Sequence, residues 1–281
     1  MKIIIILILI FVLLMVLIIL ESIRELSNLK VTEYNIDAPE NLKGKKLIFL
    51  SDYHEAAKLN DKIINEIKRI SPDMILIGGD MLNGKSTSED TAPAVELINS
   101  MADVADIYYA MGNHERKLIE DIYGTGSIWD DFKAEVSDKE HFLNNQEVEP
   151  IEDMVIYGLD LELEYFARFV IKKPSKEEML RLLGAPDKSK MNILLGHAPD
   201  LYSSYKEWGS DLSLAGHFHG GIVRLPLLGG VISPRFRFFP KYDHGLYEED
   251  GAKMIVTSGL GQHSMKLRLG NIPELVLINL V

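Results

Sequence analysis

The sequence predicts an α/β fold behind an apolar N-terminal helix, and three observations carry that prediction. Short, mostly apolar runs at 47–50, 74–77, 192–195 and 212–215 have the length of buried strands. Helical periodicity separates the first two of these runs. A cluster of Asp, Asn or His follows each run within a few residues, as is typical of the carboxyl edge of an open α/β sheet.

The first half of the chain alternates between predicted strands and helices. A strand over 46–51 precedes a helix over about 60–70, in which isoleucines recur at helical spacing. After a strand at 74–77, we expect a second helix from near Ala92-Pro93, since proline is well placed in a first turn. A third strand spans 106–111. This β-α-β-α-β order predicts a parallel sheet with right-handed crossovers.

The second half is predicted to be less regular and to end in antiparallel strands. Residues 118–148 suggest short helices and an exposed loop, and 155–159 is the next strand. A helix follows at about 175–183, and further strands lie near Ile193 and Leu212. Near the end, strands at 246–247 and 254–257 flank a Glu-Asp-Gly turn, and 275–280 is a closing strand.

The N-terminus predicts a single-pass membrane anchor. Ile3 to Leu20 are 18 consecutive apolar residues, which as a helix would span ~27 Å of a ~30 Å hydrocarbon core. A cleaved signal peptide would have a shorter apolar core and small residues at the cut, so an anchor is favoured. Positive charges before the span (Lys2 and the N-terminal amine) and after it (Arg24 and Lys30) are nearly equal in number. We expect the N-terminus inside and the domain on the extracytoplasmic face. The chain thus divides into an anchor (1–22), a polar stalk (23–44) and one domain (45–281).

Composition narrows the classes of partner. The net charge is −12, which argues against a nucleic-acid surface because such surfaces cluster Lys and Arg. The acidic net charge does not exclude a phosphate substrate, because bound metal ions can make the electrostatic potential around a site positive. The chain has no cysteine, which excludes disulfides and zinc–thiolate sites.

The polar clusters at the strand ends are candidate metal ligands, and they contain five of the eight histidines. Carboxylate and imidazole side chains suit Zn, Fe or Mn. Taken singly, most clusters also have an ordinary reading as a strand-end turn or a helix cap. The pair of histidines in Gly216–Gly221 is the hardest to explain by packing, because both rings need partners in a crowded turn. The candidate ligands are Asp52, His54, Asp80, Asn113, His197, His217 and His219.

In order and spacing, these clusters resemble the calcineurin-like metallophosphoesterase superfamily over about residues 45–281. C-terminal segments such as 216–226 and 258–261 resemble its branch of bacterial membrane-associated phosphodiesterases and lipid-related pyrophosphatases. The sequence departs from that branch at Tyr53, Phe218 and Ile222, where substrate contacts near the metals are expected to differ.

The resemblance implies two facing mixed sheets flanked by helices, and two divalent metal ions (Mn, Fe or Zn). Asp52, His54 and His219 would hold the first ion, Asp80 would bridge, and Asn113, His197 and His217 would complete the second. A hydroxide bridging the ions would attack the phosphorus. His114 would then donate a proton to the leaving oxygen. Arg224 is a candidate phosphate contact, with a structural salt bridge as the equal alternative.

We therefore expect a membrane-anchored hydrolase of phosphodiester or pyrophosphate bonds, acting on a phosphate ester that is lipid- or envelope-linked. One alternative is a pyrophosphatase for a nucleotide-linked lipid or cell-envelope precursor. Another is a metal-free scaffold with this fold, which would be expected to have lost ligands. All seven ligand positions and His114 are filled.

Overall fold

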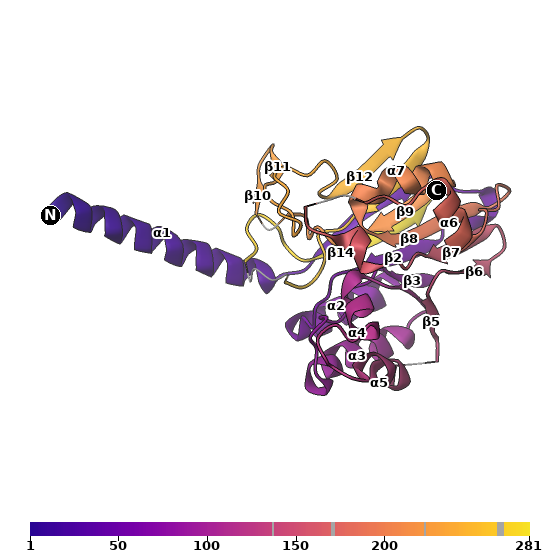
Figure 1. Ribbon diagram of the computed structural model, residues 1–281, viewed down its shortest axis with the longest axis horizontal. Helices are drawn as coiled ribbons and strands as arrows, with labels where there is room; N and C mark the ends of the chain where they lie inside the picture. Colours follow the sequence, from indigo (N-terminus) through magenta and orange to yellow (C-terminus); the bar gives the residue numbers. More distant parts are fainter. Residues whose placement is uncertain (137, 170–171, 222, 263–266) are drawn as a thin grey trace.

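The computed structural model describes residues 1–136, 138–169, 172–221, 223–262 and 267–281. Two six-stranded sheets form its centre (Figure 1). In the first sheet β2 to β5 run parallel, whereas β14 is antiparallel to β2 and parallel to β1, so the sheet is mixed. Its strands in spatial order are β1 (Lys30–Ile36), β14 (Glu274–Leu280), β2 (Lys46–Leu50), β3 (Met74–Ile77), β4 (Ile107–Ala110) and β5 (Glu140–Leu143).

The second sheet is also mixed. Its four inner strands are parallel, and an antiparallel strand closes each edge. The spatial order is β12 (Gly245–Glu249), β13 (Ala252–Val256), β9 (Leu212–Ala215), β8 (Met191–His197), β7 (Met154–Gly158) and β6 (Gln146–Ile151). A separate two-stranded ribbon consists of β10 (Arg224–Leu225) and β11 (Gly229–Gly230).

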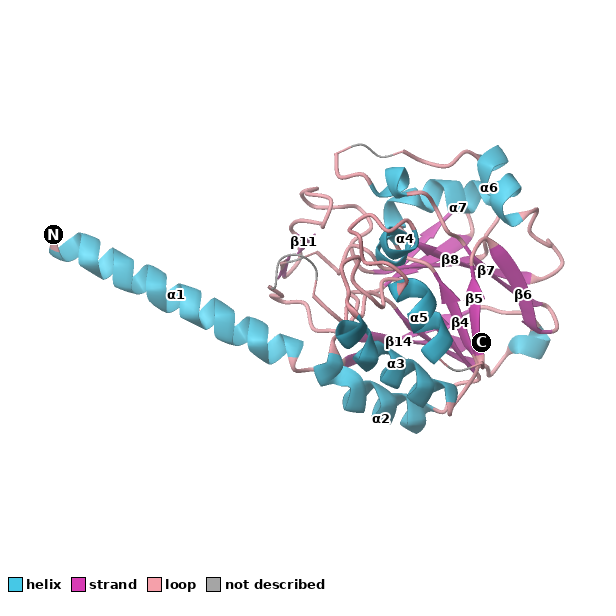
Figure 2. Cartoon of the chain, turned by 60° about the horizontal axis from the view of Figure 1, so that its bottom comes forward, coloured by secondary structure: helices cyan, strands magenta, loops and turns pink. Residues whose placement is uncertain are grey.

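Helices cover the outer face of each sheet (Figure 2). The first sheet packs against α2 (Asn60–Ile70), α3 (Ser88–Ala102) and α5 (Ile128–Glu135). The second packs against α6 (Lys176–Leu183) and α7 (Tyr202–Trp208). Helix α1 (Lys2–Leu26) lies outside these layers, whereas α4 (Asn113–Ile119) adds Leu118 to the core on the helical side of the first sheet. The 3₁₀ turns are η1 (Glu40–Leu42), η2 (Ala57–Leu59), η3 (Leu163–Phe166) and η4 (Pro199–Leu201).

Alternation along the strands explains the layers. In β2, Leu47 and Phe49 point into the core between the sheets, while Ile48 and Leu50 point towards the helices. Strands apolar on both faces are what a doubly covered sheet requires. The expected fold, two mixed sheets flanked by helices, is thereby confirmed.

Three details differ from the expectation. Residues 30–36, expected within a polar stalk, form β1 and pair along their whole length with β14. Helix α3 begins at Ser88, earlier than expected, because Thr87 and Asp90 form a capping box one turn before Pro93. The C-terminal half is only partly antiparallel, since β13 lies parallel to β9.

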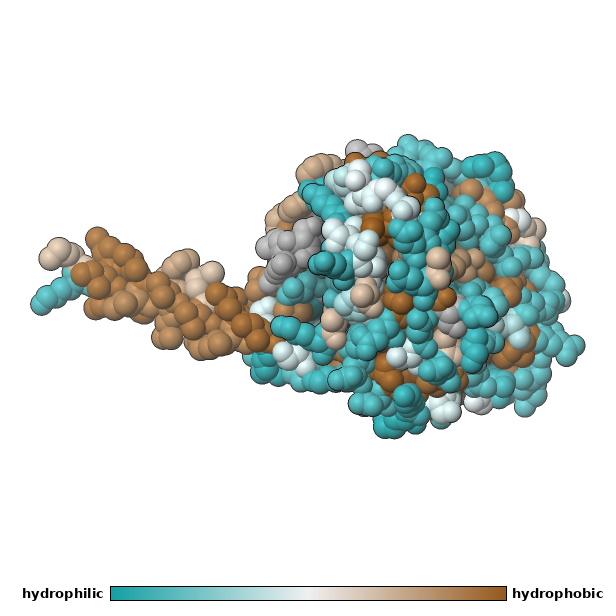
Figure 3. Space-filling model, turned by 90° about the horizontal axis from the view of Figure 1, so that it is seen from below, coloured by the Kyte–Doolittle hydropathy of each residue, from teal (hydrophilic) through white to brown (hydrophobic). Residues whose placement is uncertain are grey.

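Helix α1 projects from the domain as an isolated apolar rod (Figure 3). Within the described residues it is the one helix long and apolar enough to cross a membrane. Its last turn docks on a loop before β14. Ser22 Oγ accepts the N–H of Arg268 (3.0 Å), and the Glu25 carboxylate accepts those of Gly270 (2.9 Å) and Asn271 (3.1 Å).

Candidate metal centre

The predicted ligands meet where the carboxyl ends of both sheets converge. Their donor atoms form three overlapping groups, each with its atoms within 4.8 Å of one another. The groups are Asp52/His54/His219, His54/Asp80/His114 and Asp80/His197/His217. Asn113, the first residue of α4, borders the same pocket. The structure therefore brings all seven predicted ligands and His114 to one site.

The backbone of this site is unusual. Six of the seven candidate ligands have a left-handed φ, between 44° and 60°: Asp52, His54, Asp80, His197, His217 and His219. Non-glycine residues rarely adopt this region, and such strain persists only where surrounding contacts enforce it. Backbone hydrogen bonds between the loops supply that support, from Asp52 N–H to Gly79 O (2.9 Å) and from His54 N–H to Asp80 O (3.2 Å).

Glycines let the ligand loops approach one another. A Cβ on Gly112 would lie 2.2 Å from Asp80 Oδ1, and one on Gly216 would lie 2.1 Å from Asp52 Oδ2. Neither position has room for a side chain. The glycine before Asn113 and the glycine before His217 are thus required by close packing of the loops.

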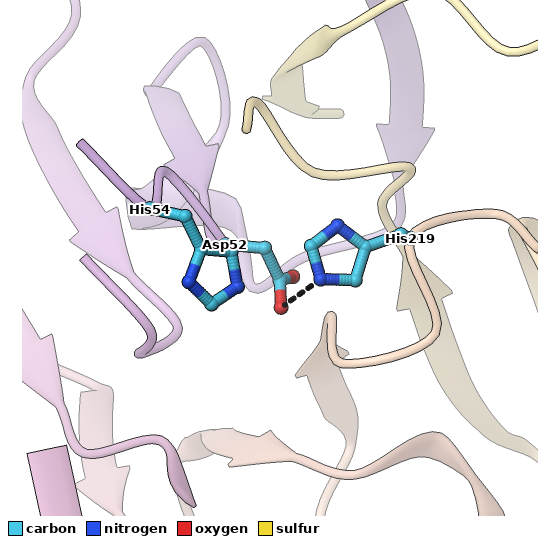
Figure 4. A group of neighbouring side chains, drawn as sticks. All are labelled: Asp52, His54 and His219. Carbon is cyan, nitrogen blue, oxygen red and sulfur yellow. Dashed lines mark ion pairs between the residues drawn. The ribbon is translucent and has the colours of Figure 1, made fainter. Parts of the chain in front are cut away.

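Asp52, His54 and His219 form the first group (Figure 4). Asp52 Oδ1 lies 3.4 Å from His219 Nε2, and the imidazole rings of His54 and His219 stack with centroids 5.1 Å apart. Burial raises the pKa of the Asp52 carboxyl to about 7, although His197 pulls it down. A bound cation would favour the ionised carboxylate and offset the free-energy cost of burying its charge.

Asp80 belongs to both the second and the third group. Its Oδ2 is 3.3 Å from His197 Nε2 and 3.8 Å from His54 Nε2, while its Oδ1 accepts the N–H of His114 (2.8 Å). Burial opposes ionisation of Asp80, but the neighbouring His197 and His114 outweigh it and hold the pKa well below its usual value. Asp80 thus faces both groups as a carboxylate.

Two features show that the site fits metal ions. Asn113 Oδ1 is buried and accepts no hydrogen bond from the described residues, as expected of an amide oxygen reserved for a cation. His197 Nδ1 lies 2.7 Å from the carbonyl oxygen of Gly78. Burial opposes protonation of His197, but the Asp80 carboxylate outweighs it and raises the pKa to about 9, so Nε2 carries a proton when no ion is bound. A cation would take the place of that proton while Nδ1 keeps its carbonyl partner, which is the arrangement of a metal-ligating histidine.

Comparison with known proteins decides the family. Residues 45–222 match the calcineurin-like phosphoesterase model. The chain belongs to this family. It is 29% identical to a metallophosphoesterase of Campylobacter jejuni over 91% of this chain and 64% of that protein. It is 25% identical to the phosphodiesterase YaeI of Escherichia coli, over 86% and 84% of the two chains. It is also 26% identical to a zebrafish transmembrane protein with a metallophosphoesterase domain, over 84% and 53%.

The family that this chain belongs to is one of metal-dependent hydrolases of phosphate esters. The chain spans about 64% of the Campylobacter relative and about half of the zebrafish one. The family match also agrees with the His and Asp groups described above, which provide donors suited to divalent ions.

Glu115 supports the phosphoesterase site, and the sequence did not reveal this role. It is fully buried, and its carboxylate accepts the N–H groups of Asp80 (2.8 Å), Met81 (2.8 Å), Leu82 (3.2 Å) and Gly112 (2.9 Å). The Tyr109 hydroxyl donates a fifth hydrogen bond (2.8 Å). All five partners are donors, so Glu115 accepts them as a carboxylate and ties the Asp80 loop to the Asn113 loop.

His114 borders the pocket with a defined tautomer. The N–H of Gly84 donates to its Nδ1 (2.8 Å), so the ring proton of the neutral imidazole lies on Nε2. The ring stands edge-on to His54, with centroids 4.8 Å apart. His114 is therefore placed to donate a hydrogen bond from Nε2.

A pocket of about 810 Å³ opens beside these residues. Four cationic side chains line it, although the whole chain is acidic: Lys85, Lys117, Arg168 and Arg235. The sequence did not single them out, because they come from separate loops and helices that only the fold brings together. Arg235 is buried, with Nη1 2.8 Å from Asp200 Oδ2 and Nε 3.2 Å from His217 Nε2.

Arg224 has the structural role that the sequence left as its alternative. Its guanidinium donates to Asp243 Oδ2 (2.9 Å) and to the carbonyl of Gly220 (2.8 Å). It is not among the described residues that line the pocket. Tyr53 and Phe218, two of the departures from the family branch, are buried and also do not line it. The third, Ile222, lies outside the described residues.

Proposed function

We propose that this protein is a membrane-anchored phosphodiesterase with a two-metal centre. The observation that carries the proposal is the position of Asp80, whose Oδ2 faces His54 Nε2 at 3.8 Å and His197 Nε2 at 3.3 Å. A carboxylate shared between two donor groups is suited to bridge two ions. The other donors would then divide between them, with Asp52, His54 and His219 on the first ion and Asn113, His197 and His217 on the second.

The metal ions, Mn, Fe or Zn, would clamp the phosphoryl group and lower the pKa of a water molecule towards neutrality. The chain supplies the remaining functions. His114 presents Nε2–H to the phosphate and leaving oxygens, while Gly84 holds the opposite side of its ring. Arg235 and Arg168 provide positive charge for the rest of the substrate. We propose proton donation by His114 as a contribution of ~10²–10⁴ to the rate.

A phosphodiester is the favoured substrate, supported by the C-terminal sequence resemblance and by the name of the E. coli relative. A pyrophosphatase acting on a nucleotide-linked lipid or cell-envelope precursor is the second candidate. Four cationic side chains line the pocket against two acidic ones, Glu55 and Asp90, and this excess of positive charge favours a pyrophosphate, which is more negative than a diester. Comparing diesters, monoesters and pyrophosphates as substrates of the metal-loaded protein separates the candidates.

Membrane attachment through α1 is part of the proposal. Its apolar residues are exposed along the whole length of the span, as a lipid-facing helix requires. The extracytoplasmic placement of the domain is proposed from the charges flanking the span, and a topology reporter fused at the C-terminus tests it.

The test of the two-metal centre is Asp80→Ala. We expect this variant to lose both ions and all measurable hydrolysis, since one carboxylate serves both. Metal content per chain by mass spectrometry and the rate on an aryl phosphodiester are the measurements. Asp130→Ala, at an exposed site on α5, is the matched control. An Asp80→Ala protein that still bound two ions per chain would contradict the bridging role.

A further inference from the structure

Residues 224–239, here called the hairpin region, expose a concentration of large apolar side chains. The ribbon turn between β10 and β11 carries Leu227, which is fully exposed, and Leu228, which is 63% exposed. Beyond β11 the chain folds back, pairing Phe238 with Ile232 and donating the Phe239 N–H to Val231 O (3.0 Å). Phe238 is 71% exposed. Patches of this kind in a soluble domain mark a surface for a partner or a membrane.

The hairpin region is joined to the base of α1 by a short series of contacts. The Arg224 N–H donates to Leu269 O (2.8 Å), and Val223 pairs with Leu269 in a β-bridge. The neighbouring Gly270 donates its N–H to Glu25 in the last turn of α1 (2.9 Å). Figure 1 shows β10 and β11 on the side of the domain from which α1 projects. The position of the hairpin region relative to α1 is therefore held by the fold.

We propose that the hairpin region is a second membrane contact, in which Leu227, Leu228 and Phe238 enter the interface of the bilayer that α1 spans. This rests on the proposed membrane attachment of α1. A helix that crosses the bilayer brings the surface around its base to the headgroups, and the apolar side chains there gain by leaving water. The half-exposed Arg237 lies next to Phe238 and suits anionic headgroups.

The same segment borders the catalytic pocket. Pro234 and Arg235 line the pocket, and Phe236 follows them directly. The guanidinium of Arg168, another pocket residue, lies 5.2 Å from the centre of the Phe236 ring. With the hairpin region in the interface, the pocket edge formed by Arg168 and Arg235 lies beside the headgroups. The substrate class that fits this arrangement is a lipid whose phosphoester reaches the pocket without leaving the bilayer.

The absence of cysteine allows a direct test. Full-length protein carrying Leu227→Cys or Phe238→Cys is labelled with a bimane fluorophore and reconstituted in vesicles of phosphatidylcholine and phosphatidylglycerol. Vesicles with and without brominated lipids are compared. Leu13→Cys in the middle of α1 is the positive control. Leu180→Cys, an exposed leucine on α6 away from α1 in Figures 1 and 2, is the negative control.

We expect brominated lipid to quench the labels at positions 13, 227 and 238 but not at 180. Quenching at 13 alone would overturn the inference while leaving the membrane anchor intact. Quenching at none of these positions would overturn the anchor as well. A label at 227 that is shielded from a water-soluble quencher, yet not quenched by lipid, would indicate a protein partner or a second copy and would also overturn it.

An activity measurement tests the consequence for substrate. Leu227→Glu and Phe238→Glu should lower the rate on a phospholipid diester in vesicles and leave the rate on soluble bis(p-nitrophenyl) phosphate unchanged. The reason is that a carboxylate resists entry into the interface but lies outside the pocket. Leu180→Glu should change neither rate. Equal rates on vesicles for wild type and both hairpin variants would contradict a role in presenting a lipid substrate.

Discussion

At the scale of single residues, the site depends on side chains that hold strained loops in place. Six candidate ligands have left-handed backbones, and the carboxylate of Glu115 joins the two loops that carry Asp80 and Asn113. Donors and acceptors are thus positioned before any substrate arrives, which is the arrangement that favours tight metal binding and rapid chemistry.

Glu115→Gln should weaken this support. The amide turns an N–H group towards backbone N–H donors, leaving at least one of them without its acceptor at a cost of about 1–3 kcal/mol. We expect a lower free energy of unfolding and weaker metal binding, measured by urea denaturation and by metal titration. Glu120→Gln, partly exposed just beyond α4, is the control. Unchanged metal affinity in Glu115→Gln would show that the loops hold their geometry without this carboxylate.

His114→Ala separates two roles for this histidine. If His114 transfers a proton to the leaving oxygen, the variant should lose ~10²–10⁴ in kcat on alkyl esters and little on nitrophenyl esters, whose leaving group departs unprotonated. If it only donates a hydrogen bond to the phosphate, the loss should be equal for every leaving group, and that result would contradict the proposed proton transfer. Both ions should remain bound, and a variant that lost metal would assign His114 to the ligand set instead.

That the candidate ligands meet was predictable from sequence, because each lies at or shortly after the carboxyl end of a buried strand, and these ends converge where the two sheets meet. Glu115 and Arg235 were not predictable in the same way. Glu115 acts on backbone N–H groups more than 30 residues away, and backbone groups leave no signal in a sequence. Arg235 reaches His217 through a loop whose path no periodicity indicates.

At the scale of elements, the strands and helices with strong periodicity were predicted well, as in α2 and β3, whose bounds match the expectation. The strand β1 was missed because its exposed and half-buried residues alternate without a continuous apolar run. Its place is decided by β14, its hydrogen-bonded neighbour from the other end of the chain. Pairing over such a distance is tertiary information.

Glu274, the first residue of β14, gives this region a dependence on pH. Burial opposes its ionisation, but hydrogen bonds from His244 and Thr32 outweigh that effect and lower the pKa to about 2. Because the folded pKa lies below the ordinary glutamate value of 4.5, the carboxylate stabilises the fold above that pH and loses its contribution as the pH falls towards 2.

We expect wild-type protein to lose about 2 kcal/mol of this contribution between pH 7 and pH 3, from the size of the pKa shift. Glu274→Gln should be less stable at pH 7 and should not show that component of the loss. Urea denaturation at the two pH values measures it. Glu207→Gln, at an exposed position on α7, should follow the wild type. If the free energy of unfolding fell by the same amount between pH 7 and pH 3 in wild type and in Glu274→Gln, the role of Glu274 would be refuted.

At the scale of the whole molecule, α1 and the domain are joined by buried contacts. Removing residues 1–20 deletes the apolar span but keeps Ser22 and Glu25, which accept three backbone N–H groups. We expect that truncate to be soluble, folded and active on an aryl phosphodiester. Removing residues 1–26 should lower the free energy of unfolding by about 1–3 kcal/mol or more. Equal stability of the two truncates would show that the end of α1 is not part of the fold.

The pairing of β1 with β14 has a consequence for the order in which the protein is made. A ribosome that adds ~5–20 residues per second releases the apolar span long before it reaches β14, which ends at Leu280. The span is therefore available for insertion while β1 still lacks its neighbour in the sheet. β1, which follows α1 in the chain, therefore stays unpaired on this side until β14 has been synthesised, so this sheet is completed only after β14 emerges.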